Sequence, residues 1–234
     1  MTTILAIETT TELASLALLT DDRLLVRELS GVGTHSQGVL PALQSLLDEA
    51  GLMLTQCDAI AFGCGPGAFT GIRTTCGIVQ GLAVGAGLPV VPVVSLQAMA
   101  QAARERTGAV DVICILDARM QEFYWARYQH NQQGPQEWQT VIEPVLSVPG
   151  AVLTDELGAN TVIATGNGVN LPGIPADKLC AVYPHAAQVA KLGLQALQRG
   201  EAGGPEVAEP LYLRNKIALT TQERMQAKAT GQAV

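Results

Sequence analysis

The sequence predicts an α/β fold built from two duplicated halves, each with the order strand–strand–strand–helix–strand–helix (βββαβα). The first observation is that order itself, which can be followed twice through the apolar runs of the chain. The second is that the same kinds of residue end matching strands: an acidic residue, Glu8 or Asp117, ends the first strand of each half, and a glycine cluster ends the fourth. The third is composition, because 48% apolar and 15% charged residues are typical of a compact globular protein.

The first half opens with three short apolar runs, which predict strands because turn residues bound them. Thr34 and Gln37 have the spacing of a capping box, and Leu40, Leu43 and Leu47 follow on one helical face. The expected elements are strands at 4–8, 13–20 and 23–29, a helix from Thr34 to Gly51, a strand at 59–63, a helix at 70–86, a strand at 89–94 and a helix at 95–106.

The second half repeats this order over residues 107–200, whereas the first half occupies residues 1–106. Its expected elements are strands at 111–117, 122–129 and 138–145, a helix near 149–157, a strand at 161–165 and a helix at 185–199. Residues 201–234, rich in Gly, Pro and Glu, are expected to form a tail. Within this tail the apolar segment 210–214 (PLYLR) is predicted to be a docking point.

The stretch GPGAFTGIRT, residues 65–74, joins a buried strand to a helix for which Thr70 is the expected N-cap. Gly77, Gly81 and Gly85 then recur on one face of that helix. Each glycine costs about 1 kcal/mol relative to alanine in a helix interior, so a close neighbour is expected against the stripe. That neighbour is either a partner molecule or another element of the same domain.

The order of elements is the one found in the actin-like ATPase superfamily, which has an RNase H-like fold. In such ATPases the turn after the first strand directs backbone N–H groups at a phosphate, and opposed acids hold a metal–phosphate between the halves. Here Ala118 and Arg119 replace the small-residue turn that would approach a phosphate closely, so the site is expected to be vestigial. Its residues are Glu8, Thr9, Thr10, Gly65, Gly67 and Asp117.

Several function classes are excluded or disfavoured by what the sequence lacks. No acid follows the glycine turn at the distance that a dinucleotide-binding fingerprint needs, and no P-loop motif occurs. No metal-ligand motif is present, so no metal site is predicted. The net charge of −7 and scattered basic residues indicate that any tRNA would be bound only through a complex. Five isolated cysteines and the lack of a signal peptide or membrane span indicate a cytoplasmic protein.

Four segments together, ILAIETTT, HSQGVLPALQSLL, GPGAFTGIRTTCGIVQGLA and PLYLR, resemble the TsaB family of bacterial proteins over essentially the whole chain. The resemblance implies a role in forming threonylcarbamoyladenosine in tRNA. In that system TsaD transfers the threonylcarbamoyl group, TsaE is a small ATPase, and TsaB is a non-catalytic platform that binds TsaD. The resemblance implies no cofactor for the chain alone, with ATP or ADP at the subunit junction of the complex.

The same resemblance implies that the chain has lost the chemistry of TsaD. TsaD carries a metal-binding V-N-H-x-x-G-H after the glycine helix, and the matching stretch here places Ser95 and Met99 at the histidine positions. Neither side chain is a plausible ligand for a catalytic iron or zinc. The chain is therefore expected to be an inactive relative rather than an enzyme.

In the TsaB family the helices of the N-terminal half form the contact with a second copy or with TsaD. Carried over to this sequence, the expected interface residues are His35, Leu40, Leu43, Thr70, Arg73, Gly77, Gly81 and Gly85. Two alternatives stay open. One is an actin-like ATP-dependent phosphotransferase that uses Glu8 and Asp117. The other is a peptidase acting on a partner, for which His35 and Ser36 would be the machinery.

Overall fold

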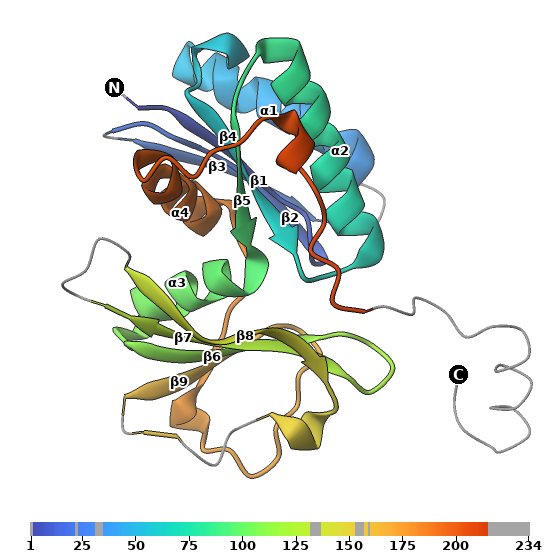
Figure 1. Ribbon diagram of the computed structural model, residues 1–234, viewed down its shortest axis with the longest axis vertical. Helices are drawn as coiled ribbons and strands as arrows, with labels where there is room; N and C mark the ends of the chain where they lie inside the picture. Colours follow the sequence, from blue (N-terminus) through green and yellow to red (C-terminus); the bar gives the residue numbers. More distant parts are fainter. Residues whose placement is uncertain are drawn as a thin grey trace, which may run out of the picture.

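The computed structural model describes residues 2–21, 23–30, 35–131, 137–152, 157–158 and 160–214. Two five-stranded sheets lie one above the other, and helices separate them (Figure 1). The first sheet has the order β3-β2-β1-β4-β5 and the second the order β10-β9-β6-β7-β8. In both sheets the first strand of the half pairs antiparallel with the next strand and parallel with the fourth.

The strands of the first sheet are β1 (Ile4–Glu8), β2 (Leu13–Leu19), β3 (Leu24–Ser30), β4 (Ala59–Gly65) and β5 (Val90–Val94). Every residue of β1 and β4 is buried because both faces of the sheet are covered. Helices cover both faces of a sheet wherever its strands are parallel, and such strands are apolar along their whole length. The continuous apolar runs of the sequence at 4–7 and 59–63 follow from this.

The strands of the second sheet are β6 (Asp111–Asp117), β7 (Phe123–His130), β8 (Trp138–Ser147), β9 (Thr161–Thr165) and β10 (Leu179–Ala181). The sequence did not predict β10, whose three residues are too few to show an alternating pattern. The helix expected near 149–157 is also not found as predicted. A 3₁₀ turn occupies Pro149–Ala151, and residues 153–156 lie outside the described residues.

Two of the four helices that the structure describes pack on the sheet of the opposite half of the chain. Helices α1 (His35–Ala50) and α2 (Phe69–Ala86) cover the outer face of the first sheet (Figure 1). Helix α3 (Ser95–Thr107) continues directly from β5 but packs on β6, β7 and β9 of the second sheet. Helix α4 (Ala186–Gln198) follows the second sheet but packs on β1, β2 and β4 of the first.

The packing therefore divides the molecule differently from the chain order. We call the first sheet with α1, α2 and α4 the first lobe, and the second sheet with α3 the second lobe. The predicted division into residues 1–106 and 107–200 follows the order of elements along the chain, whereas α3 and α4 each contact the sheet of the other half. These two helices also pack on each other, so one apolar core is continuous between the sheets.

The last described segment, residues 201–214, returns along the first lobe and then crosses to the second; we call it the C-terminal strap (Figure 1). Val90 and Gly203 form an isolated antiparallel bridge, and the Leu211 N–H donates to the Cys64 carbonyl at 2.7 Å. A 3₁₀ turn at Pro205–Val207 lies against α2. Among the described residues, no helix is long and apolar enough to cross a membrane.

Two expectations about the helices are wrong in detail. Helix α2 begins at Phe69 with Ala68 as its N-cap, so Thr70 lies within the first turn and does not cap the helix. Leu43 is buried at 4% exposure in the core beneath α1, together with Val39, Leu46 and Leu47. Leu40 lies outside that face and is 50% exposed, because the buried stripe runs through the positions one before and three after it.

Close packing of α4 on the first sheet gives a testable prediction. A methyl group added at Gly193 would overlap the side chain of Ala61 in β4, whereas one added at Gly77 on α2 would meet nothing. Gly193→Ala should lower the free energy of unfolding by about 1–3 kcal/mol through overpacking. The control Gly77→Ala should raise it by about 0.5–1 kcal/mol because alanine is the better helix former. Urea unfolding followed by circular dichroism measures both, and equal effects would contradict the packing.

Candidate functional site

The turn after β1 and the turn before α2 are packed so tightly that three glycines have no room for a side chain. A Cβ atom at Gly67 would overlap Thr10, and one at Gly71 would overlap the Thr9 carbonyl. A Cβ atom at Gly63 would overlap the carboxylate of Glu8. We call this contact the turn–turn lock. Gly67 and Gly71 of the GPGAFTG stretch are thus explained by contacts inside the first lobe.

Glu8 lies at the centre of the turn–turn lock with no exposed surface. Its carboxylate accepts hydrogen bonds from the Thr10 N–H at 2.6 Å and from the Ser95 hydroxyl at 2.9 Å. Burial raises the pKa of Glu8 above its usual value, and the hydrogen bonds from Thr10 and Ser95 offset this only in part. Ser95, one of the two residues predicted to stand in place of metal-binding histidines, is therefore engaged with Glu8.

Thr9 and Thr10 also direct their polar groups into the protein. The Thr9 hydroxyl donates to the Gly71 carbonyl at 2.8 Å and lies 2.5 Å from the Thr75 hydroxyl. The Thr10 carbonyl accepts from the Ala68 N–H at 2.7 Å, and the Thr10 N–H is held by Glu8. A phosphate-binding turn needs N–H groups aimed at the ligand. In this turn the N–H of Thr10 already has a partner within the chain.

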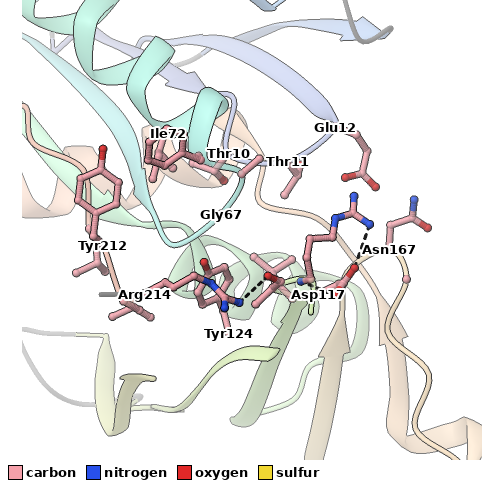
Figure 2. Close-up of a pocket in the computed structure, with 18 of the residues that line it drawn as sticks. Thr10, Thr11, Glu12, Gly67, Ile72, Asp117, Tyr124, Asn167, Tyr212 and Arg214 are labelled. Atoms are coloured by element: carbon pink, nitrogen blue, oxygen red, sulfur yellow. Dashed lines mark hydrogen bonds and ion pairs between the residues drawn. The ribbon is translucent and has the colours of Figure 1, made fainter. Parts of the chain in front are cut away.

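A cavity of about 390 Å³ lies between the lobes, next to the turn–turn lock (Figure 2). We call it the cleft. Asp117 lines it, and its carboxylate accepts from the Arg119 N–H at 2.9 Å and from the Arg119 guanidinium at 3.2 Å. Glu8 does not line it. The expected pair of acids facing each other across the cleft is therefore not formed, because Glu8 is enclosed in the first lobe.

The remaining residues of the expected nucleotide loop lie around the same place. Thr10 and Gly67 line the cleft. Gly65 has a left-handed φ of 108°, and an added Cβ atom would come 3.2 Å from the Leu211 carbonyl of the strap. Such a φ favours glycine, and the strap passes close over this position. Among the described residues, no three His, Cys, Asp or Glu side chains lie together where they could hold a metal ion.

The exposed face of α2 is unlike an ordinary solvated helix face. Gly77, Gly81 and Gly85 are exposed, and a Cβ atom at any of them would meet nothing within 4 Å. Contrary to the same-domain explanation, no element in the part of the chain that the structure describes packs against the stripe. Val84 beside them is 68% exposed. Arg73 is the only charged residue in the 18 residues of the helix.

The expected interface residues are only partly brought together by the structure. Leu40, Thr70 and Arg73 are exposed along with the three glycines, whereas Leu43 is buried in the core. His35 is the first residue of α1, and its side chain lies outside the described part of the structure. The expected interface residues that are exposed lie on α2, except for Leu40, which lies on α1.

Sequence reasoning missed the partner of Arg73. Its guanidinium lies over the Phe69 ring, 3.6 Å from the ring centroid, and its Nε donates to the Tyr212 hydroxyl at 2.6 Å. Tyr212 belongs to the docking segment 210–214, which docks on this chain's own α2. A pair separated by 139 residues leaves no local signal, although the apolar PLYLR segment did indicate a contact.

Comparison with known proteins places the chain in a family. A family model described as TsaD, tRNA N6-adenosine threonylcarbamoyltransferase, matches residues 31–232. A protein of Escherichia coli described as tRNA threonylcarbamoyladenosine biosynthesis protein TsaB is 37% identical and covers 92% of this chain and 96% of its own length. The chain belongs to the TsaB family. A second TsaB, from Haemophilus influenzae, is 36% identical and covers 92% of this chain and 94% of its own length.

A solved structure described as YeaZ from Pseudomonas aeruginosa supports the TsaB assignment and the fold. It is 40% identical, has a TM-score of 0.82, and covers 91% of this chain and all of that one. The actin-like fold predicted from the duplicated βββαβα order is confirmed by this likeness and by the family model. Met99, the second residue predicted to stand in place of a metal-binding histidine, is buried in the core with no exposed surface.

The buried carboxyl of Glu8 predicts an unusual pH dependence. Because its pKa is raised on folding, the folded state holds the proton more tightly than the unfolded state does. Its contribution to stability is complete below the unfolded pKa near 4.5 and is lost as pH rises through the raised pKa. Glu8→Gln removes the titrating carboxyl, and with it this loss of stability, while keeping an oxygen acceptor. The stability of Glu8→Gln relative to wild type should therefore increase from acid toward neutral pH, as measured by urea unfolding.

Glu105→Gln provides the control of opposite sign. Burial alone would raise the pKa of Glu105, but hydrogen bonds led by that from Lys191 outweigh it and lower the pKa. This group contributes stability above its unfolded pKa and loses it as pH falls through the folded pKa. The relative stability of Glu105→Gln should fall toward neutral pH. If the relative stabilities of Glu8→Gln and Glu105→Gln changed in the same direction with pH, the environment described for Glu8 would be contradicted.

Proposed function

We propose that the chain is a non-catalytic scaffold subunit of the machinery that forms threonylcarbamoyladenosine in tRNA, and that it binds and activates a TsaD protein. The names of the relatives support the pathway, since the E. coli and H. influenzae proteins are described as threonylcarbamoyladenosine biosynthesis proteins. The single observation that supports a binding role is the open glycine stripe of α2. The docking surface consists of the outer face of α2 with Leu40 of α1.

The energetic argument starts from the cost of the stripe. Three glycines in place of alanine cost the helix roughly 3 kcal/mol. At Gly71, which also lies in α2, the close contact with the Thr9 carbonyl offsets such a cost, but nothing in the described structure does so at Gly77, Gly81 and Gly85. A partner helix that approaches the bare backbone would supply the missing contacts. A partner helix packed on Gly77, Gly81 and Gly85 would therefore offset the cost of these glycines.

The chemistry of this face also suits a protein partner. The central parts of protein interfaces are depleted in charged residues and enriched in apolar ones. Helix α2 has one charged residue, Arg73, and that residue is already paired with Tyr212. Val84 of α2 and Leu40 of α1 are exposed apolar side chains that supply further contact area. Exposure of such a weakly charged, partly apolar face to water costs free energy, and a partner that covers the face removes this cost.

The absence of catalysis is supported by what fills the corresponding positions. Ser95 donates to Glu8 and Met99 packs in the core, so neither is available to a metal, and their side chains do not suit a catalytic iron or zinc. A phosphotransferase that used Glu8 and Asp117 would need both acids at the cleft, and Glu8 lies inside the first lobe. The proposed partners are TsaD and TsaE in the cytoplasm, with a homodimer forming when TsaD is absent.

Two features of the proposal concern small ligands and RNA. The chain alone is proposed to bind no cofactor, and ATP or ADP would lie at the subunit junction of the complex. The tRNA would be held only through the complex, in keeping with the net charge of −7.

The proposal predicts the behaviour of Gly81→Leu. A leucine at the middle of the stripe keeps the helix folded, because the position is open, but holds a partner helix away from the backbone. We expect the self-dimer to be lost and the affinity for TsaD to fall at least about 100-fold, as for a central interface residue. Light scattering after gel filtration and calorimetry with TsaD measure the two effects. The control is Gln198→Leu, an exposed leucine on α4.

A reconstituted assay separates scaffolding from catalysis. Wild type together with TsaD and TsaE should support tRNA modification, and Gly81→Leu should not. Modification that proceeds equally well without this subunit would contradict the scaffold role. An unchanged dimer and unchanged TsaD affinity in Gly81→Leu would contradict the docking surface.

A further inference from the structure

The C-terminal strap is attached to both lobes. On the first lobe, Leu211 is held by the Cys64 carbonyl, and Tyr212 packs on Phe69 and Arg73. Two residues later the strap reaches the turn between β6 and β7 in the second lobe through Arg214. It is the last described segment of the chain, and it lies opposite the α3–α4 contact that joins the lobes on the other side of the cleft (Figure 1).

Arg214 is bound to the β6–β7 turn at three points. Its guanidinium forms an ion pair with Glu122 at 2.5 Å and donates to the Ala118 carbonyl at 3.0 Å. It also lies 3.5 Å from the Met120 sulfur. The Arg214 side chain is only 16% exposed and that of Glu122 28%, so water screens this ion pair less than it screens a surface pair. Figure 2 shows Arg214 reaching into the cleft from the strap.

The turn that Arg214 holds is strained. Arg119, Met120 and Gln121 have φ values of 62°, 56° and 58°, and none of them is glycine. The left-handed region is unfavourable for residues with a Cβ atom, and three such residues in succession persist only where surrounding contacts impose them. Within the described part of the chain, these are the only non-glycine residues with positive φ. Arg214 supplies contacts on both sides of the strained residues.

We propose that Arg214 is a latch: the C-terminal strap holds the strained β6–β7 turn against the first lobe and so sets the opening of the cleft. Ala118–Met120 of the turn and Leu211–Arg214 of the strap both line the cleft. When Arg214 is released, the turn relaxes out of the left-handed region and the cleft widens. A ligand or segment larger than the cavity of about 390 Å³ enters only after this release. This inference does not depend on which partner covers α2.

Hydrogen exchange of the full-length protein, read by mass spectrometry, tests the latch. The turn contains two reporters, the Ala118 N–H bound to the Glu122 carbonyl at 2.9 Å and the Glu122 N–H bound to the Arg119 carbonyl at 3.1 Å. In Arg214→Ala we expect both amides to exchange about tenfold faster, as for the loss of a charge-assisted hydrogen bond. The matched control is Arg199→Ala, which removes an Arg–Glu pair with Glu201 that lies outside the cleft.

A rescue experiment separates strain from simple loss of contact. Glycine adopts the left-handed region freely, so Gln121→Gly should make the turn depend less on Arg214. In Arg214→Ala/Gln121→Gly the protection of Ala118 and Glu122 should return to within about twofold of wild type. The Leu211 N–H, bound to the Cys64 carbonyl on the first lobe, should exchange faster than in wild type in Arg214→Ala and also in the double variant, because the strap is unlatched in both.

The distance between lobes gives the second readout. Spin labels at Met53→Cys in the first lobe and Gln139→Cys in the second lie on exposed residues, whereas the five native cysteines are buried. Arg214→Ala should add a population with a longer distance between labels. Unchanged exchange and an unchanged distance in a folded Arg214→Ala protein would overturn the latch. Faster exchange without rescue by Gln121→Gly, or without the longer distance, would overturn it as well.

A milder variant keeps the test decisive if Arg214→Ala does not fold. Glu122→Gln removes the charge of the ion pair and leaves an oxygen acceptor for Arg214. It should show a smaller acceleration, of about threefold, at the same two amides. No acceleration at these amides in Glu122→Gln would contradict the proposal.

Discussion

The structure depends on one close contact, the turn–turn lock between the residues after β1 and the residues before α2. Gly67 and Gly71 allow the Thr9 and Thr10 backbone to lie where a Cβ atom would otherwise be. Glu8 and Ser95 join the lock from β1 of the first lobe and α3 of the second, so elements of both lobes meet at one buried carboxylate. Because protein interiors are close-packed, this contact fixes the position at which α2 leaves the sheet.

The glycines around the lock and along α2 have two different structural roles. At Gly63, Gly67 and Gly71 the missing side chain is needed inside the molecule, whereas at Gly77, Gly81 and Gly85 it leaves bare backbone facing outward. The first group holds α2 rigidly on the first sheet, and the second group lies on the face so presented. A rigid helix loses little conformational freedom when a partner covers it, which favours its use as a docking element. Of the residues that resemble a nucleotide loop, Gly67 thus contacts the turn that positions the start of the helix.

Much of the fold could be predicted from the sequence, because buried strands leave continuous apolar runs and turn residues separate them. The strands at 4–8, 111–117 and 161–165 have the bounds that the sequence predicts. Strand β10 is too short to leave a pattern, and the buried face of α1 was placed one position away at Leu40. The sequence could not predict which of the two sheets α3 and α4 cover, because the apolar face of a helix does not identify the sheet on which it packs. The same holds for Tyr212 and Arg214, whose contacts lie 139 and 96 residues away along the chain.

The exchange of α3 and α4 between the sheets has a consequence for the duplicated architecture. A piece of the chain that ended after α3 would lack the sheet on which α3 mainly packs, and its own sheet would lose the cover that α4 provides. The complementary piece would have the same two defects in reverse. Neither repeat can therefore exist as an autonomous folding module, even though each has a complete set of strands. A mutation in either repeat is accordingly expected to destabilise the whole molecule cooperatively.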